Sequence, residues 1–187
     1  MVAFMRKLII LIVFGALLAA TPAHAERTSI EDAFSPHQGA TAMIVKTINS
    51  AHHSICVAAY GFTSKPIAEA LIVAHRRDVD VEAVLDMKAN RHYGLAGILN
   101  ANGIPVRLNG HYAILHDKFM IIDHRKLELG SFNYTRSAES RNAENVLVIS
   151  GHKKLIRDYA QQWSRLWNEA APFMALSSAH QDVPPNP

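Results

Sequence analysis

The most informative stretch of the chain is residues 116–133, which read HDKFMIIDHRKLELGSFN. Residues 118–122 are largely apolar, residues 126–129 alternate between polar and apolar, and His124 and Arg125 lie between the two runs. Two such runs separated by a short polar segment are typical of strands joined by a turn. The stretch therefore predicts a strand pair with polar residues at its outer ends.

The residues on either side predict an alternation of helices and strands. Apolar residues at helical spacing, such as Ala42, Val45 and Ile48, indicate helices, whereas short continuous apolar runs indicate buried strands. Ser64 can cap a helix that has Pro66 in its first turn. This pattern predicts an α/β fold with one mixed sheet and helices on both faces. We expect helices over 39–51, 64–77, 93–101 and 155–167, and strands over 54–60, 79–85, 104–108, 113–115 and 145–149.

The composition is that of an ordinary globular protein. Of the 187 residues, 49% are hydrophobic and 19% are charged, which excludes a disordered or collagen-like chain. Cys56 is the only cysteine, so no internal disulfide can form. We expect a single domain over 39–170, preceded by a lead-in without periodicity over 26–38 and followed by a flexible tail over 171–187.

The first 25 residues have the pattern of a secretory signal peptide. Arg6 and Lys7 precede an apolar run over 8–20, which is shorter than the roughly 20 residues of a membrane-spanning helix, and Ala23 and Ala25 provide a cleavage site. We expect a periplasmic or secreted protein; the alternative is a retained N-terminal anchor. Cleavage would leave 17 of the 19 Lys and Arg against 16 Asp and Glu, so overall charge is a weak argument for nucleic-acid binding.

Polar residues in the central stretch suit a phosphate group. Residues two apart on a strand point to the same face, so His116 and Lys118 would present an imidazole beside an ammonium group. An imidazole can attack phosphorus, while Lys118 and the amide of Asn133 hold the phosphate oxygens. Gly130 and Ser131 are small enough for the backbone to approach a ligand closely. From the residues alone, a solvated polar pair at a strand end is an open alternative.

The spacing of these residues resembles the signature of the phospholipase D superfamily, His-x-Lys-x4-Asp-x6-Gly-Ser-x-Asn. The neighbouring stretches 57–64, 79–86 and 142–145 also resemble the small, secreted bacterial endonucleases of that superfamily, which carry one copy of the motif. Asp78 departs from this pattern, since a turn glycine is expected there, and Asp tolerates such turns. All six fixed positions of the signature are matched: His116, Lys118, Asp123, Gly130, Ser131 and Asn133.

The resemblance implies roles for individual residues. His116 would attack a phosphodiester and become a phosphohistidine, while Lys118, Ser131 and Asn133 bind the phosphate. Glu144 would accept a hydrogen bond from the second ring nitrogen of His116 and so fix its orientation. For Asp123, which follows an apolar run, we expect a structural ion pair and not a catalytic role.

A covalent mechanism needs a second group that protonates the leaving oxygen. The superfamily uses a second motif for this, but this sequence has one: His152 and Lys154 lack the rest of the signature. We therefore expect a homodimer whose two motifs meet in one active site. The lysines of the two subunits would provide the positive charge, so the expected reaction needs no metal and no cofactor.

Other functions fit this sequence less well. The histidines show no metal-ligand spacing, and Ser131 lacks the Gly-x-Ser-x-Gly context of a hydrolase nucleophile. The complete set of motif residues argues against an inactive relative, and the few aromatic residues argue against a pure nucleic-acid-binding module. The sequence thus favours an endonuclease acting on DNA, with RNA as an open alternative substrate, and without stable membrane association. The alternative is a phospholipase D or phosphatidyl transferase acting on lipid headgroups.

Overall fold

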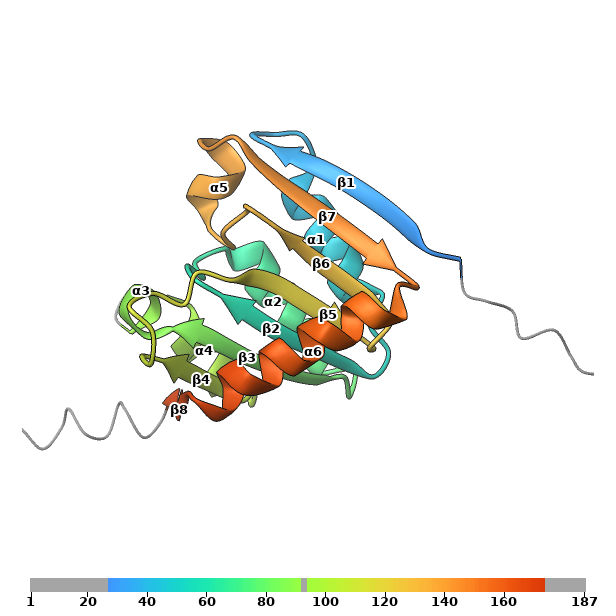
Figure 1. The fold of residues 1–187 in the computed structure, drawn as a ribbon. Helices are drawn as coiled ribbons and strands as arrows, with labels where there is room; N and C mark the ends of the chain where they lie inside the picture. Colours follow the sequence, from blue (N-terminus) through green and yellow to red (C-terminus); the bar gives the residue numbers. More distant parts are fainter. Residues whose placement is uncertain (1–26, 92–93, 174–187) are drawn as a thin grey trace, which may run out of the picture.

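An eight-stranded mixed sheet forms the centre of the computed structural model, which describes residues 27–91 and 94–173 (Figure 1). The strand order across the sheet is β1-β7-β6-β5-β2-β3-β4-β8. The strands are β1 (Ser29–Ser35), β2 (Ser54–Ala59), β3 (Asp80–Asp86), β4 (Val106–Asn109), β5 (Lys118–Ile122), β6 (Lys126–Gly130), β7 (Glu144–Ser150) and β8 (Ala171–Pro172).

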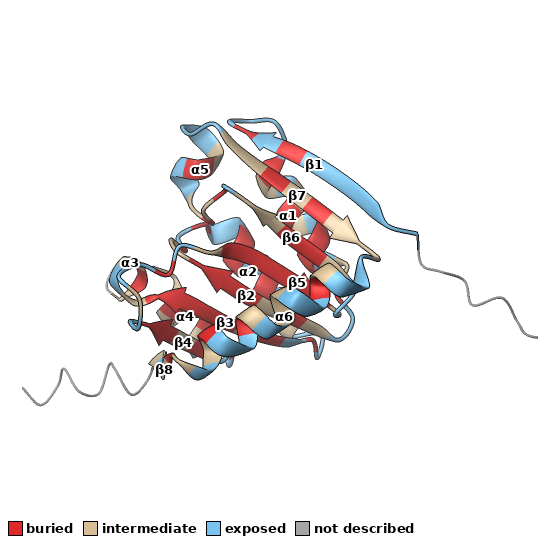
Figure 2. Ribbon diagram, viewed as in Figure 1, coloured by how far each residue is buried: buried red, intermediate tan, exposed pale blue. Residues whose placement is uncertain are grey.

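Helices cover both faces of this sheet, as the sequence predicted. On one face the apolar sides of α1, α2 and α4 pack against the larger core cluster. On the other face α6 packs diagonally across β2 to β5, where Trp163 and Leu166 are buried (Figure 2). The helices are α1 (Ala40–Asn49), α2 (Lys65–His75), α3 (Met87–Asn90), α4 (Ala96–Ala101), α5 (Arg136–Ser140) and α6 (Lys153–Asn168).

The topology brings several chain segments to one edge of the sheet. β2 is parallel to β3 but antiparallel to β5, and β5, β6 and β7 form an antiparallel run. The end of β2, the start of β5, the end of β6 and the start of β7 therefore lie together, at the left in Figure 1. We call this the motif edge, because the two strands of the central stretch begin and end there.

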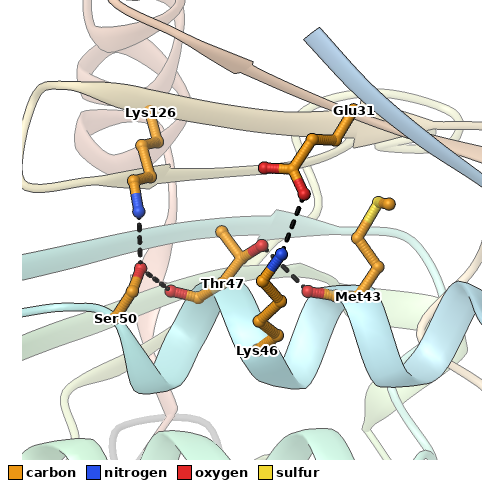
Figure 3. Close-up of polar contacts among 6 residues, drawn as sticks. All are labelled: Glu31, Met43, Lys46, Thr47, Ser50 and Lys126. Atoms are coloured by element: carbon orange, nitrogen blue, oxygen red, sulfur yellow. Dashed lines mark hydrogen bonds and ion pairs between the residues drawn. The ribbon is translucent and has the colours of Figure 1, made fainter. Parts of the chain in front are cut away.

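The opposite edge, which we call the turn edge, contains the β5–β6 turn. The Arg125 N–H donates to the Ile122 carbonyl at 2.9 Å, and the two residues between them, Asp123 and His124, both have positive φ. These are the features of a type I′ hairpin turn, whose twist matches that of the strands. Nearby, Lys126 Nζ donates to Ser50 Oγ at 2.8 Å and joins β6 to the end of α1 (Figure 3).

The sheet extends further along the chain than expected. The expected lead-in over 26–38 contains β1, which pairs along the whole of β7 from Ser29 opposite Ser150 to Ser35 opposite Glu144. The first two residues of the expected tail form β8, and its residues 174–187 lie outside the described part of the chain. The sequence did not reveal β1 because an edge strand exposes most of its side chains. The signal peptide predicted over 1–25 also lies outside the described residues.

The prediction of a strand over 113–115 was wrong. This segment is a loop fixed by individual bonds: the Leu115 N–H donates to Asp86 Oδ2 at 2.9 Å, and Lys88 Nζ donates to the Ala113 carbonyl at 3.2 Å. Leu115 is buried in the cluster under α6. Leu115 is therefore an apolar residue anchored in a loop, and the segment 113–115 is not a strand. The helix expected from residue 93 begins at Ala96 as α4, and residues 92–93 are not described.

Candidate active site

The motif edge brings together the residues that the sequence singled out. His116 lies just before β5 and Lys118 is the first residue of that strand, while Gly130 ends β6. A cavity of about 260 Å³ is lined by these three residues together with Tyr159 of α6 and their neighbours. Ser131 and Asn133 lie in the loop that follows β6, and Glu144 begins β7.

Lys118 is almost completely buried at this edge. Its Nζ donates to the His116 carbonyl at 2.6 Å and lies 5.5 Å from the centre of the Tyr60 ring. Burial lowers the pKa of the Lys118 ammonium, and the carboxylates of Asp117 and Glu144 act in the opposite direction without restoring the usual value. A partly desolvated cation interacts strongly with an anion, as phosphate binding requires.

His116, in contrast, is exposed to solvent. Its ring packs against the Tyr60 ring, with centroids 4.9 Å apart and planes at 53°. No hydrogen bond to its ring nitrogens is found among the described residues. The expected hydrogen bond from a ring nitrogen of His116 to Glu144 is therefore not made in this structure. Instead, Glu144 Oε1 accepts from Asn142 Nδ2 at 2.9 Å. The imidazole is thus supported by an aromatic ring on one side and is accessible to a substrate.

The backbone around Gly130 and Ser131 explains the small residues of the motif. A Cβ atom at Gly130 would collide with the Asn145 carbonyl oxygen, so no larger residue fits between β6 and β7. Ser131 N–H donates to that same oxygen at 3.2 Å, and Ser131 Oγ accepts from the Asn145 N–H at 3.1 Å. Ser131 therefore holds the start of β7, and with it Glu144, beside the motif.

Asn133 presents an unsatisfied polar group at the site. Its Oδ1 atom is buried and has no hydrogen-bond partner among the described residues. An unpaired buried amide costs free energy in a folded protein, so such groups are a mark of sites that bind polar ligands. The Asn133 backbone is fixed, because its carbonyl accepts from the Thr135 N–H at 2.6 Å.

A buried pair supports the loop that carries Asn133. Tyr134 and Glu128 are both inaccessible to solvent, and the Tyr134 hydroxyl donates to Glu128 Oε2 at 2.5 Å. Burial raises the pKa of Glu128 to about 8, although the bond from Tyr134 acts in the opposite direction. The Tyr134 carbonyl in turn accepts the N–H groups of Thr63 and Ser64 at 2.8 and 2.9 Å. This loop is therefore tied to the segment that follows β2.

Asp123 lies at the turn edge, at the other end of β5 from Lys118. The expected ion pair was wrong: its carboxylate accepts three backbone N–H bonds, from His52, His53 and Ser54, at 2.9, 2.7 and 2.9 Å. Burial alone would raise the pKa of Asp123, but the three bonds outweigh it and lower the pKa. Asp123 thus fixes the connection between α1 and β2 and has no place in the cavity.

Sequence reasoning assigned no role to Tyr60, whose ring touches His116 and Lys118. The available signal was its position directly after the buried strand β2. The Cys56 thiol is not a second nucleophile: burial, followed by the charges of Glu82 and Asp80, raises its pKa to about 12. Within residues 27–91 and 94–173, no group of three or more metal-ligating side chains is found, and no helix is long and apolar enough to cross a membrane.

Comparisons with known proteins agree with this geometry. Residues 44–167 match the family model described as cardiolipin synthase, PLD-like domain. A phospholipase D of Rickettsia prowazekii is 38% identical over 138 residues, which is 73% of this chain and 67% of that protein. A mitochondrial cardiolipin hydrolase of Xenopus laevis is 31% identical over 139 residues, 73% of this chain and 66% of that protein.

A solved structure has the same fold. It is that of Nuc from Salmonella typhimurium, a phospholipase D family member, with a TM-score of 0.75 and 36% identity over 78% of this chain and 98% of that one. The family match covers more than half of the chain and includes every residue of the motif edge described above. The chain therefore belongs to the phospholipase D superfamily, and it is a phosphodiesterase.

Proposed function

We propose that the chain is a secreted endonuclease that hydrolyses phosphodiester bonds of DNA through a covalent intermediate on His116. The observation that carries this proposal is the arrangement at the motif edge. His116 presents an exposed imidazole just before β5, Lys118 presents a buried ammonium group at the start of β5, and Asn133 presents an amide with a buried, unpaired Oδ1 in the loop after β6. This set provides one nucleophile and two groups that hold a phosphate.

In the first step a ring nitrogen of His116 attacks the phosphorus atom in line with the leaving oxygen. A P–N bond forms and the P–O bond to the leaving nucleoside breaks, and that oxygen takes a proton from an acid. Lys118 and the Asn133 amide stabilise the charge on the remaining phosphate oxygens. Ser131 assists by holding β7 beside the motif. We assign to Glu144, whose Oε1 accepts from Asn142 Nδ2 in this structure, the orientation of the imidazole during the reaction.

In the second step water attacks the phosphohistidine. The P–N bond breaks, a new P–O bond forms, and the group that acted as the acid now accepts a proton from the water. We assign this acid and base role to His116 of a second copy of the chain, since His116 is the one histidine among the described residues that line the cavity. The positive charge of two copies of Lys118 makes a metal ion unnecessary.

An uncovered part of the sheet supports this homodimer. The helix α6 packs on β2 to β5, so the same face of β6, β7 and β1 lacks a helix among the described residues (Figure 1). This area includes Ile30 and Phe34, which are 63% and 47% exposed. Leu147, opposite Leu129 in the sheet register, continues it across β7 toward β6. A second copy that covers this face would also bring its own motif edge close.

The choice of DNA as substrate rests on the resemblance to one-motif endonucleases and on the similarity to nearly the whole of Nuc. The cavity at His116 is small and its lining includes His116, Lys118 and Gly130 of the motif, as suits a backbone phosphate with its flanking groups in solvent. The predicted signal peptide would take such an enzyme to the periplasm or the medium, away from the cell's own DNA.

A second candidate function is hydrolysis of phospholipids. Relatives of this chain are named phospholipase D and cardiolipin hydrolase. In addition, Ile114, two residues before His116, is 51% exposed and could contact an apolar surface. The same covalent chemistry would then act on a lipid headgroup.

One experiment separates the two functions. Purified protein is incubated in EDTA with supercoiled plasmid and, in parallel, with vesicles of cardiolipin and phosphatidylcholine. The proposal predicts nicked and linear plasmid with wild type and with His52→Ala, an exposed histidine of the turn edge, and none with His116→Ala. Hydrolysis of lipid without plasmid cleavage would reject the nuclease and favour the second candidate.

A further inference from the structure

A second cavity, of about 360 Å³, lies next to the loop that carries Asn133. Its walls come from the segment after β2, the first turn of α2 and the start of α5, with Thr41 of α1. None of these residues belongs to the motif. The cavity therefore has no role in the chemistry at His116 described so far.

The floor of this cavity contains a polar group without a partner. Ser64 is only 5% exposed and occupies the N-cap position of α2, yet its hydroxyl makes no hydrogen bond to any described residue. An N-cap serine usually accepts a bond from the first helical turn. Here the Ser64 hydroxyl remains available, beside a helix start whose first N–H groups have no intrahelical acceptor and carry partial positive charge.

Two cations border the same cavity. Lys65 and Arg136 are both exposed, and among the described residues neither has an ion-pair partner. The one acid in the lining, Glu139, is already engaged, because its Oε2 accepts both the N–H and the hydroxyl of Thr41, at 3.1 and 2.5 Å. The cavity thus combines an excess of positive charge with an unused hydroxyl, which are the groups that bind a phosphate.

The position of the cavity relates it to the active site. Tyr134 joins the two: its carbonyl binds the N–H groups of Thr63 and Ser64, and it directly follows Asn133. Arg136 is three residues from Asn133, so their Cα atoms are at most about 11 Å apart. Two sites this close can contact neighbouring phosphates of one nucleic-acid strand.

We propose that this cavity binds a second backbone phosphate of the polynucleotide substrate, a neighbour along the strand of the phosphate that His116 attacks. Arg136 and Lys65 hold the phosphate oxygens, and the Ser64 hydroxyl donates to one of them. The inference rests on the proposed nuclease function and adds to it a subsite that favours polymeric substrates over small diesters.

Two substrates of different length test the subsite. One is a 12-nucleotide single-stranded DNA and the other is bis(p-nitrophenyl) phosphate, which has one phosphate and cannot reach the second cavity. For Arg136→Ala and Lys65→Ala we expect KM for the oligonucleotide to rise about tenfold with kcat nearly unchanged. The slope of log(kcat/KM) against log[salt] should become shallower by about 0.7 for each variant. For bis(p-nitrophenyl) phosphate, kcat/KM of each variant should fall by less than about twofold.

Ser64→Ala provides a variant with little risk to folding, because the hydroxyl makes no bond in the structure. We expect an unchanged melting temperature and a KM for the oligonucleotide about threefold higher. Lys153→Ala is the matched control: this exposed lysine follows the end of β7 at the turn edge. It removes the same charge and should change neither KM nor the salt slope.

The outcomes distinguish this inference from the proposed function. If wild type cleaves the small diester but no oligonucleotide, the nuclease function and the subsite both fail. If wild type cleaves the oligonucleotide and the three cavity variants match the control, the subsite alone is rejected. It is also rejected if the variants lose activity only on cardiolipin, which carries two phosphates, because the cavity would then serve a lipid.

Discussion

The two ends of the β5–β6 hairpin have the same kinds of residues but use them differently. At the turn edge, Asp123 has three backbone partners, and Lys126 and Lys46 donate to Ser50 and Glu31 at 2.8 Å (Figure 3). At the motif edge, His116 is exposed without a hydrogen bond to its ring and Asn133 Oδ1 is buried without a partner. The polar groups of one edge are satisfied within the protein, whereas those of the other are available to a ligand.

This contrast divides the signature of the superfamily into two physical parts. A strand of five residues separates Lys118 from Asp123, a distance of about 17 Å at the usual rise per residue. Asp123 therefore cannot contact the phosphate that His116 of the same chain attacks. We infer that the motif combines a reactive end with a structural end that fixes the strand between them.

The largest effect is expected at the motif edge. Replacing Lys118 by Met removes the cation but keeps an apolar chain of similar length, so kcat/KM should fall on the order of a thousandfold, equal to about 4 kcal/mol. The melting temperature should stay or rise, because a buried charge is lost. Kinetics and calorimetry on the same preparation check both. The opposite result, a lower melting temperature for Lys118→Met with unchanged kcat/KM of the folded protein, would mean that Lys118 is structural and would contradict the difference between the two edges.

The reverse pattern is expected at the turn edge. Asp123→Asn keeps one acceptor oxygen but loses the charge, and the free energy of unfolding should fall by about 2 kcal/mol. Because the pKa of Asp123 is lowered in the folded state, its contribution is present above the unfolded value and is lost as pH falls through the folded value. The difference in the free energy of unfolding between wild type and Asp123→Asn should therefore shrink as the pH falls.

Activity measurements complete the test at Asp123. Folded Asp123→Asn protein should keep kcat within about twofold of wild type, because the carboxylate lies outside the site. A thousandfold loss of kcat with unchanged stability would show that Asp123 acts in the reaction, and would refute its structural role.

A smaller, pH-dependent effect is expected from the buried acid near the motif edge. The pKa of Glu128 is raised to about 8 in the folded protein, so the folded state holds a proton that the unfolded chain releases near its ordinary value of 4.5. Stability should therefore fall as pH rises from about 4.5 to 8. In Glu128→Gln this part of the pH dependence should disappear, so the two stability profiles should diverge over this pH range. Parallel profiles in denaturant titrations would reject this assignment.

The smallest effect is expected at the turn before β3. Asp78 has a φ of 65°, a conformation that glycine adopts more readily than residues with a Cβ atom. Asp78→Gly should raise the free energy of unfolding by about 0.5 kcal/mol and leave kcat unchanged. Thermal unfolding of the two proteins measures the difference; a lower melting temperature for the variant would mean that the Asp78 side chain stabilises the turn.

The sequence predicted the central elements because their signals are local. The apolar run of β5 and the spacing of Trp163 and Leu166 in α6 depend on burial, which repeats with the period of each element. At Asp78, where the resemblance expects a turn glycine, the backbone has the left-handed conformation that glycine favours. Missed elements depend on distant partners or single caps: β1 is held by β7, and α5 is a five-residue helix capped by Thr135, whose Oγ1 accepts the Ala138 N–H at 3.1 Å.

The site was predictable to a similar degree. The motif spacing identified His116, Lys118 and Asn133, which the fold brings to one edge. It could not reveal Tyr60, because contact between Tyr60 and His116 arises only when β2 pairs with β5. It could not reveal the bonds of Asp123 either, since their donors are backbone groups that every sequence contains.

The stereochemistry at phosphorus tests the central claim, attack by His116, most directly. A phosphorothioate diester of one configuration is cleaved by wild type in ¹⁸O-labelled water, and the configuration of the product is determined. Two successive in-line displacements, first by His116 and then by water, predict net retention of configuration. Inversion would mean that water attacks the diester in a single step, and would contradict the covalent role of His116.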